Sequence, residues 1–283
     1  MKRVLVIGHR GMLGSDLMTL LASGKVETRG VDLPEVDIAD PKSVADCLDA
    51  FGSDVVINCA AWTDVDGAES HREEAMHVNG VGAGNVAHAA AACGAKVVHV
   101  STDFVFDGTK DAPYVENDTP CPISVYGESK LDGERRVADA ADDHLIVRTS
   151  WLYGAHGRNF VATMLRLSDE KDELTVVDDQ RGSPTWTRDL SRAILALVDV
   201  DARGIVHACG RGECSWYEFA CEIVKRAGSS TPVRPITSAE FDRPASRPAN
   251  SALDTTKLHA LTGFTFPAWQ DSLAAFMEER PSS

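Results

Sequence analysis

Continuous runs of apolar, mostly β-branched residues recur along the first half of the chain, and Ala-rich stretches with helical spacing separate them. The runs are RVLVI (3–7), DVVINCA (54–60), KVVHVS (96–101) and HLIVRT (144–149). The helical patterns between them cover 12–23, 41–51 and 80–94. A strand that is apolar on both faces is typical of a parallel sheet covered by helices on both sides. The βαβα order therefore predicts an α/β fold with a Rossmann-type, doubly wound parallel sheet.

The pattern loosens after about residue 150. Further helical patterns cover 156–170, 187–199 and 215–228, and Ser215 is a plausible N-cap for the last of these. The segment 230–254 is rich in Pro and Ser, which predicts an extended loop. We expect a nucleotide-binding core over 1–150 and a smaller C-terminal substrate-binding lobe over 151–283, the two being interleaved in sequence.

Charge and composition narrow the kinds of partner. The 283 residues carry a formal charge of −15, which repels nucleic acid and anionic membranes. No apolar run approaches the roughly 20 residues of a membrane-spanning helix, and the N-terminus shows no secretory signal. We therefore expect a cytoplasmic protein that binds neither nucleic acid nor membrane.

Seven cysteines without a CxxC pair indicate reduced thiols. The cluster of His207, Cys209, Cys214 and Cys221 has spacings that fit no common zinc pattern, so ordinary buried thiols are the favoured interpretation and no metal is predicted.

The first chemical motif is VLVIGHRGMLGSDL, which follows the first predicted strand and opens the first predicted helix. Its glycines have the spacing GxxGxxG, a variant of the dinucleotide fingerprint. Glycines at these points allow a tight turn and a close approach of the backbone to a diphosphate, which the helix N-terminus attracts. We expect cofactor contacts from Gly8, Arg10, Gly11, Met12, Leu13 and Gly14.

Two residues bear on the choice between NADH and NADPH. Asp32 follows the second predicted strand, where an acid binds the adenosine ribose hydroxyls and repels a 2′-phosphate. Arg10 favours the opposite choice, because it could pair with that phosphate. Asp32 is about equally well explained as a solvated turn acid. Asp37 and Ile38 are expected to flank the adenine.

Small and hydroxyl residues follow two other predicted strands. Ala60 and Ala61, with Thr63 just beyond, would let a ligand lie across the end of the sheet. Ser101, Thr102 and Asp103 lie at the same edge, although hydroxyl groups there could equally cap the strand.

Tyr126 and Lys130 lie four residues apart in SVYGESKLDGE, a predicted helix with Ser124 as its candidate N-cap. The two side chains therefore project together, and the Lys130 ammonium is expected to lower the phenol pKa of Tyr126. A tuned phenol can donate a proton to a carbonyl while hydride arrives at carbon, and Thr102 can hold the same oxygen. Glu134 is expected to be a surface i,i+4 partner of Lys130.

The chain resembles the extended short-chain dehydrogenases/reductases and, among them, the dTDP-4-dehydrorhamnose reductase family. The matching stretches are GHRGMLG, NCAAWTDVDGAE, STDFVFDG, YGESKLDGE, RTSWLYG, NFVATML, VVDDQRGSPT, SWYEFA and RPANSALD. The resemblance implies reduction by NADPH or NADH of the 4-keto group of dTDP-4-dehydro-6-deoxy-L-mannose, which gives dTDP-L-rhamnose.

The same resemblance implies roles for individual residues. It places Thr102, Tyr126 and Lys130 in the catalytic set. The residues that it places at the substrate are Asp103, Phe104, Trp151, Asn159, Arg247 and Asn250. An arginine suits a diphosphate through charge-assisted hydrogen bonds, although a solvated loop arginine is an alternative. Asp16 falls where some relatives carry an acid tied to a divalent metal near a dimer contact, but partner carboxylates are not evident in the sequence.

Other activities remain open from the sequence alone. One is a sister activity on sugar nucleotides, such as a 4,6-dehydratase or an epimerase. Another is a non-catalytic NADP-binding subunit resembling the β subunit of methionine adenosyltransferase. A homodimer is an option that the sequence does not decide.

Overall fold

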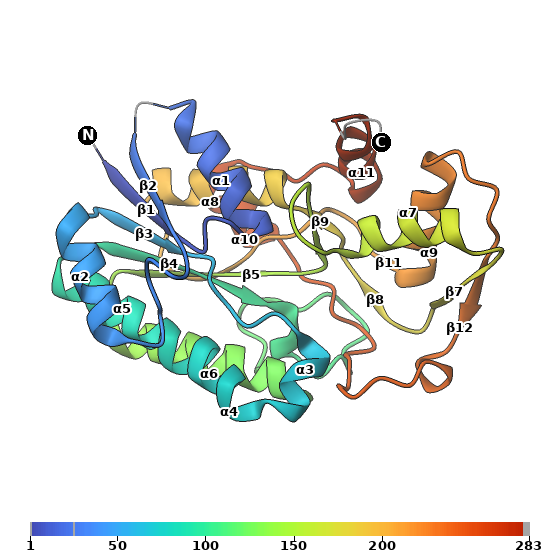
Figure 1. Ribbon diagram of the computed structural model, residues 1–283, viewed down its shortest axis with the longest axis horizontal. Coiled ribbons are helices and arrows are strands. Elements are labelled where there is room, and N and C mark those ends of the chain that lie inside the picture. The colour runs from blue at the N-terminus through green and yellow to red at the C-terminus, as the bar shows by residue number, and fades with distance from the viewer. Residues whose placement is uncertain (1, 25, 280–283) are drawn as a thin grey trace.

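The computed structural model describes residues 2–24 and 26–279, and its largest element is a parallel sheet with helices on both faces (Figure 1). In order across the sheet, the strands are β10 (Gly204–His207), β5 (His144–Thr149), β4 (Lys96–Thr102), β3 (Val55–Asn58), β1 (Arg3–Ile7) and β2 (Glu27–Val31). Every neighbouring pair is parallel. The predicted doubly wound fold is confirmed.

Strand β1 shows why these runs are apolar without alternation. Its side chains point alternately to the two faces, so Val4 and Val6 join one hydrophobic core while Leu5 and Ile7 join the other. Both faces are buried, because helices cover each of them.

The helices that cover the two faces come from different parts of the chain. One face is covered by α1 (Met12–Ala22), α8 (Thr187–Asp199) and α10 (Thr256–Thr262). The other is covered by α2 (Pro41–Phe51), α5 (Ala83–Ala92) and α6 (Val125–Ala140). Between β3 and α5 lie α3 (Val65–Ser70), α4 (Arg72–Met76) and a π-helical segment (His77–Gly82). Sequence from both halves of the chain thus builds the core around the sheet.

A second lobe lies beyond the carboxyl ends of the central strands (Figure 1). Its helices are α7 (Phe160–Glu170), α9 (Trp216–Arg226) and α11 (Trp269–Glu279). Its strands are β7 (Leu174–Val177), β8 (Arg181–Gly182), β11 (Cys214–Ser215) and β12 (Val233–Ile236), and β6 (Leu152–Tyr153) pairs with β9 (Thr185–Trp186) nearby. The lobe has its own aromatic core. Ser215 caps α9, as predicted, and it also forms a reciprocal capping box with Glu218. The division at residue 150 stays a prediction, and α8 and β10 show how later sequence returns to the sheet.

The prediction of a loop over 230–254 is wrong for the start of this segment. There the chain forms the strand β12, which pairs in parallel with β7. Leu174 donates to the carbonyl of Pro232, and Asp178 donates to that of Ile236. Pro235 is tolerated because β12 has a free edge, where the missing N–H leaves no partner unsatisfied. A tertiary partner therefore overrides the low strand propensity of this segment.

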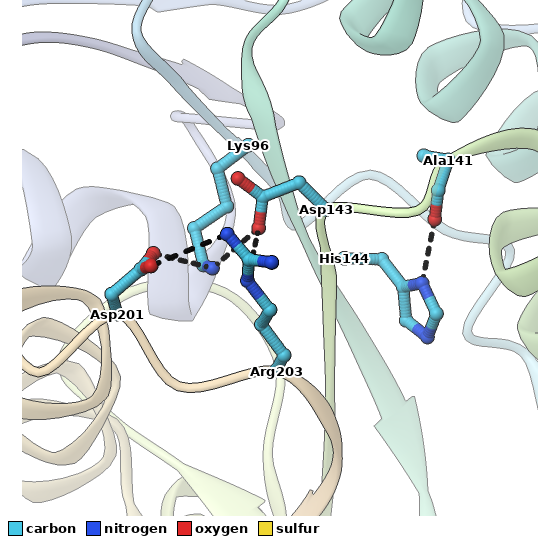
Figure 2. Close-up of polar contacts among 6 residues, drawn as sticks. All are labelled: Lys96, Ala141, Asp143, His144, Asp201 and Arg203. Atoms are coloured by element: carbon cyan, nitrogen blue, oxygen red, sulfur yellow. Dashed lines mark hydrogen bonds and ion pairs between the residues drawn. The ribbon is translucent and has the colours of Figure 1, made fainter.

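A charged cluster lies at the amino ends of the central strands, which are the ends away from the second lobe (Figure 2). Lys96, the first residue of β4, lies 2.7 Å from Asp143 and 2.9 Å from Asp201, and its side chain is buried. Arg203 contacts both carboxylates. Lys96 and Thr102 lie at opposite ends of β4, about 20 Å apart at the usual strand rise, so this cluster is remote from the residues predicted to be catalytic.

Within the part of the chain that the structure describes, no helix has the length and apolarity needed to cross a membrane.

Candidate active site

The order of the strands creates a crevice between β1 and β3. The chain runs outward from β1 to β2 and then returns to the other side of β1, so the connections leave β1 and β3 in opposite directions. Ligands of doubly wound sheets bind at such a switch point, at the carboxyl ends of the strands. Gly8 follows β1 there with φ of 78°, and a Cβ on Gly8 would lie 2.7 Å from the amide nitrogen of Ala60. The two predicted segments therefore meet at the crevice.

The first turn of α1 fits a bound diphosphate. A Cβ on Gly14 would lie 2.2 Å from the carbonyl oxygen of Gly8, so only glycine lets the helix begin this close to the loop. Gly11 is the N-cap and provides no side-chain cap, which leaves the amides of Met12 and Leu13 facing outward from the helix end. Such amides and the helix dipole attract phosphate. The residues present thus fit the diphosphate of a dinucleotide.

Asp32 lies beside the glycine loop, as the sequence predicts. Its carboxylate accepts hydrogen bonds from the amides of Arg10 and Leu33, at 3.1 and 2.9 Å. The Arg10 guanidinium donates to the carbonyl of Leu33 at 2.8 Å and to Glu35 at 2.6 Å. Glu35, for which the sequence predicts no role, therefore holds the cation that was expected to meet a 2′-phosphate.

The other residues expected to bind the cofactor lie at the same carboxyl edge of the sheet. Ile38 is buried, and a Cβ on Gly82 would lie 2.9 Å from its side chain. Asp37 is exposed and accepts from the amide of Ala39 at 2.9 Å. Ala61 is half-buried and Thr63 is exposed, both beyond the end of β3. Their roles in cofactor binding stay predictions.

The three residues predicted to be catalytic are brought together. Thr102 is the last residue of β4, and α6 packs along β4 with Tyr126 in its first turn and Lys130 one turn later. Ser124 caps α6 by accepting from the amide of Gly127, as predicted. The Tyr126 hydroxyl group interacts with Thr102. Lys130 is buried and donates to the carbonyl of Val100 at 2.7 Å.

The expected lowering of the Tyr126 pKa is wrong for this structure. Burial raises the pKa of Tyr126 to about 12, the interaction with Thr102 opposes this, and the charge of Asp103 adds to it. The ammonium of Lys130 donates to the Val100 carbonyl. Burial also lowers the pKa of Lys130 to about 8, although the charge of Glu134 opposes that fall. Tyr126 is therefore a protonated phenol at neutral pH, which suits a proton donor.

Asp103 contacts Thr102 directly. Thr102 donates to its carboxylate at 2.9 Å, and burial raises the pKa of Asp103 to about 6. The next residue, Phe104, packs edge-on against the ring of Tyr126, with the ring centroids 5.6 Å apart.

Glu134 corrects a further expectation, since it is buried and not on the surface. Its carboxylate accepts from Ser101 at 2.5 Å and from two nitrogens of Arg148, at 2.9 and 2.7 Å. The signal in the sequence was Arg148, a charged residue after the apolar run of β5, together with Ser101 at the polar end of β4. Such residues need a buried partner.

A cavity of about 900 Å³ opens beside Phe104, between this edge of the sheet and the second lobe. Trp151 and Trp216 line it, and their rings stack with centroids 3.5 Å apart. Trp151 has φ of 46°, an uncommon backbone conformation for a bulky residue, and it packs over Gly182. Trp216 was not singled out in the sequence, although it lies within the matching stretch SWYEFA.

The three remaining predicted substrate residues differ in position. Arg247 lines the cavity and pairs with Asp66 at 2.9 Å. Asn159 caps α7 by accepting from the amide of Ala162 and donates to the carbonyl of Gly154. Asn250 donates to the carbonyl of Lys110 and accepts from the amide of Ala252. The side chains of Asn159 and Asn250 thus hold loops, and their substrate contacts stay predictions.

Asp16 is buried and accepts a hydrogen bond from the hydroxyl of Thr187 at 2.5 Å. Across residues 2–24 and 26–279, no three His, Cys, Asp or Glu side chains are grouped so that they could hold a metal ion.

A glycine loop at the switch point, a Tyr and Lys pair on α6, and an adjoining cavity define a dinucleotide-dependent oxidoreductase of the extended short-chain type. The family model described as the RmlD substrate binding domain matches residues 1–281, and the chain belongs to this family.

Named relatives cover nearly the whole chain. A dTDP-4-dehydrorhamnose reductase of Sinorhizobium fredii is 43% identical over 95% of each chain. A dTDP-4-keto-6-deoxy-D-glucose reductase of Streptomyces niveus is 41% identical over 89% of this chain and 88% of its own. The crystal structure of dTDP-4-dehydrorhamnose reductase from Bacillus anthracis in complex with NADP is 40% identical, with a TM-score of 0.96 over 99% of this chain and 100% of that one.

Proposed function

We propose that the protein reduces the 4-keto group of dTDP-4-dehydro-6-deoxy-L-mannose with NADPH or NADH and forms dTDP-L-rhamnose. The observation that carries the proposal is the position of Tyr126. This protonated phenol lies beside Thr102, at the same carboxyl edge of the sheet as the glycine loop. Its ring contacts Phe104, which lines the 900 Å³ cavity. The names and full-length similarity of the relatives support the same reaction.

In this proposal the glycine loop, the N-terminus of α1 and Asp32 hold the cofactor. Bound NAD(P)H supplies a hydride to C4 of the sugar. Tyr126 donates its phenolic proton to the C4 oxygen, which becomes the hydroxyl group of the product. Thr102 holds the same oxygen by a hydrogen bond, and Lys130 stabilises the tyrosinate that remains. The proton and the hydride together account for the two hydrogens that the ketone gains.

The cavity suits a nucleoside diphosphate sugar. Arg247 offers a guanidinium for phosphate, and the stacked Trp151 and Trp216 offer an aromatic wall. Asp103 lies next to the catalytic hydroxyl groups, where it can bind a sugar hydroxyl. The cytoplasmic location and a homodimer stay predictions.

Phe104 separates this reaction from 4,6-dehydration. Loss of water from the sugar requires a base at C5 and an acid for the departing hydroxyl group. The dehydratases that the sequence resembles supply an Asp–Glu pair directly after the strand-end threonine, whereas this chain has Asp103 followed by Phe104. Phenylalanine cannot transfer a proton, and ketone reduction has no need of a second acid at this position.

The test is a cofactor-oxidation assay on the purified protein. We expect one NAD(P)H oxidised per 4-keto sugar reduced when dTDP-4-dehydro-6-deoxy-L-mannose is generated in situ, and no activity on dTDP-glucose. Redox-neutral conversion of dTDP-glucose to its 4-keto-6-deoxy product would contradict the proposal. Binding of NADP without any turnover would instead indicate a non-catalytic subunit.

The name of the Streptomyces niveus relative makes a second substrate worth testing in the same assay. That substrate is dTDP-4-keto-6-deoxy-D-glucose, which has not been epimerised. A higher kcat/KM on it than on the epimerised sugar would reassign the substrate and leave the reaction class unchanged.

A further inference from the structure

A buried ion pair lies directly behind the residues predicted to be catalytic. Glu134 on α6 is 3% exposed, Arg148 on β5 is 1% exposed and Ser101 on β4 is 3% exposed. Glu134 accepts two hydrogen bonds from Arg148 and one from Ser101, so one carboxylate joins three elements. The guanidinium also lies over the ring of Phe106, 5.1 Å from its centroid.

The register of the sheet places this cluster one residue from Thr102. Ser101 is opposite Arg148 in the β4–β5 ladder, and Thr102 is opposite Thr149. Tyr126 and Lys130 lie eight and four residues before Glu134 on the same helix. The distance between Thr102 on β4 and the Tyr–Lys pair on α6 is therefore set partly by the bonds of Glu134. Buried bidentate bonds of this kind have fixed geometry.

Few of the groups around Lys130 favour its charged ammonium form. From β4, His99 lies 3.4 Å from its Nζ, and burial keeps the pKa of His99 well below its usual range, so this neighbour is neutral. After β3 comes Cys59, whose thiol pKa burial raises to about 12. On its own helix, Tyr126, a protonated phenol, lies one turn before Lys130, and Glu134 lies one turn after it. Arg148 from β5 donates to both oxygens of the Glu134 carboxylate.

The charge of Asp103, which follows β4, acts on Tyr126 and raises its pKa. Of the neighbours that affect Lys130, Glu134 makes the largest contribution in favour of the ammonium form.

We propose that Glu134 is a positioning residue of the active site. Its bonds to Arg148 and Ser101 fix α6 against β4 and so set where Tyr126 and Lys130 lie relative to Thr102, while its carboxylate, one turn from the buried Lys130 on the same helix, favours the ammonium form of that residue. The inference rests on the proposed function only for its catalytic consequence. The charge on Lys130 can be measured without turnover.

The first test is Glu134→Gln, followed by lysine side-chain ¹⁵N NMR as a function of pH. The variant Lys130→Arg assigns the signal by its loss. Removing a neighbouring carboxylate disfavours the ammonium form, so the titration midpoint of Lys130 should move from near pH 8 to lower pH by about one pH unit. The alkaline limb of kcat/KM should move in the same direction, with KM for the cofactor nearly unchanged. An unmoved Lys130 titration in folded Glu134→Gln would overturn the proposal.

A matched control is Glu128→Gln, which removes an exposed carboxylate from the same helix, where Glu128 pairs with Arg72. It should leave the titration of Lys130 in place. An equal movement in this control would show a general charge effect and would also overturn the assignment to Glu134.

Glu134→Gln leaves the buried guanidinium of Arg148 without its counter-charge and could prevent folding. The double variant with Glu134→Leu and Arg148→Met replaces the ion pair with apolar side chains, an exchange that buried pairs often tolerate. We expect a folded protein whose Lys130 titrates at lower pH and whose kcat is reduced at least tenfold at pH 8. A folded double variant with wild-type kcat and an unmoved Lys130 would contradict the proposal.

The two hypotheses fail in different ways. If the wild type does not oxidise NAD(P)H with the keto sugar, the proposed function fails, while the Lys130 titration still decides the role of Glu134. If the wild type is active and the titration does not respond to Glu134, only the inference fails.

Discussion

Arg247 donates a hydrogen bond to Asp66 at 2.9 Å, and these residues lie 181 positions apart in the sequence. Asp66 also accepts from Arg243 at 3.1 Å and from the amide of Ala245 at 3.2 Å. On the same short helix, α3, Glu69 accepts from the amide of Val125, the residue before Tyr126. One helix of six residues therefore connects the loop beside the cavity with the N-terminus of α6.

Asp66→Asn should weaken binding of the sugar nucleotide. The change removes the carboxylate that orients Arg247, and loss of a charge-assisted bond of about 1–2 kcal/mol corresponds to a rise in KM of about 5- to 30-fold. Steady-state kinetics with the keto sugar measures this, and Asp242→Asn, a carboxylate that also lines the cavity, is the control. A fall in KM would show that Asp66 competes with the substrate for Arg247.

The same contact has a predictable dependence on pH. Burial alone would raise the pKa of Asp66, but hydrogen bonds from Arg247 and Ala245 and the charges of Arg247 and Arg243 lower it overall. A carboxyl group with a lowered folded-state pKa stabilises the fold above its unfolded pKa, about 3.9, and loses that contribution as pH falls through the folded value. The difference in Tm between wild type and Asp66→Asn should be constant from pH 5 to 8 and shrink below about pH 4. A difference that disappears near neutral pH would be inconsistent with this linkage.

Tyr126→Phe keeps the ring and removes the proton donor. We expect kcat to fall about 10²- to 10⁴-fold, with little change in the Kd for the cofactor. Tyr217→Phe, on a partly exposed position of α9, is the control for loss of a phenol. Near-wild-type turnover by Tyr126→Phe would remove this residue from the catalytic set.

Cofactor preference should depend on Glu35 as well as Asp32. Glu35→Gln removes the carboxylate that pairs with Arg10, which frees the guanidinium for a 2′-phosphate, so the NADPH/NADH ratio of kcat/KM should rise about 5- to 10-fold. Asp32→Ala should raise the same ratio, because it removes a ribose acceptor and relieves repulsion of the phosphate. Asp46→Asn breaks an exposed pair with Lys42 and is the control. Unchanged ratios in both test variants would show that this loop does not face the ribose.

Lys96→Met should lower stability and leave activity intact. The variant keeps the apolar stem but removes the cation that lies between Asp143 and Asp201, so the two carboxylates repel (Figure 2). We expect Tm to fall by about 2–4 °C, with kcat unchanged because the cluster lies at the opposite end of β4 from Thr102. Lys42→Met, which breaks an exposed i,i+4 pair, should change Tm by less than about 1 °C. Equal shifts in the two variants would contradict the importance of burial at Lys96.

The elements that the sequence predicts well are those that local pattern determines. The strands that contain Val4 and Val98 are apolar on both faces because helices cover both, and α6 begins at the capping residue Ser124. The position of Tyr126 and Lys130 one turn apart on α6 follows from helical spacing alone. Motif spacing also places Gly8 at the crevice.

What the sequence does not predict depends on contacts between distant segments. Glu134 has the spacing of a surface partner on α6, and its burial depends on the β4–β5 ladder, which places Ser101 and Arg148 together beside it. Similarly, β12 forms because β7 lies beside it. The Tyr126 pKa rises because folding removes water from the phenol, a change that i,i+4 spacing does not reveal.

Helix α1 packs against α8, although the two are far apart in the order of synthesis. The ribosome completes α1 at residue 22 and does not begin α8 until residue 187. At about 5–20 residues per second, the ribosome needs roughly 8–33 s to synthesise the intervening segment. During that time Leu13, Leu17 and Leu21 lack the helix that buries them in the finished protein. The nascent chain therefore carries an uncovered apolar surface through most of its synthesis, and a product truncated before α8 would expose it permanently to aggregation or to chaperones.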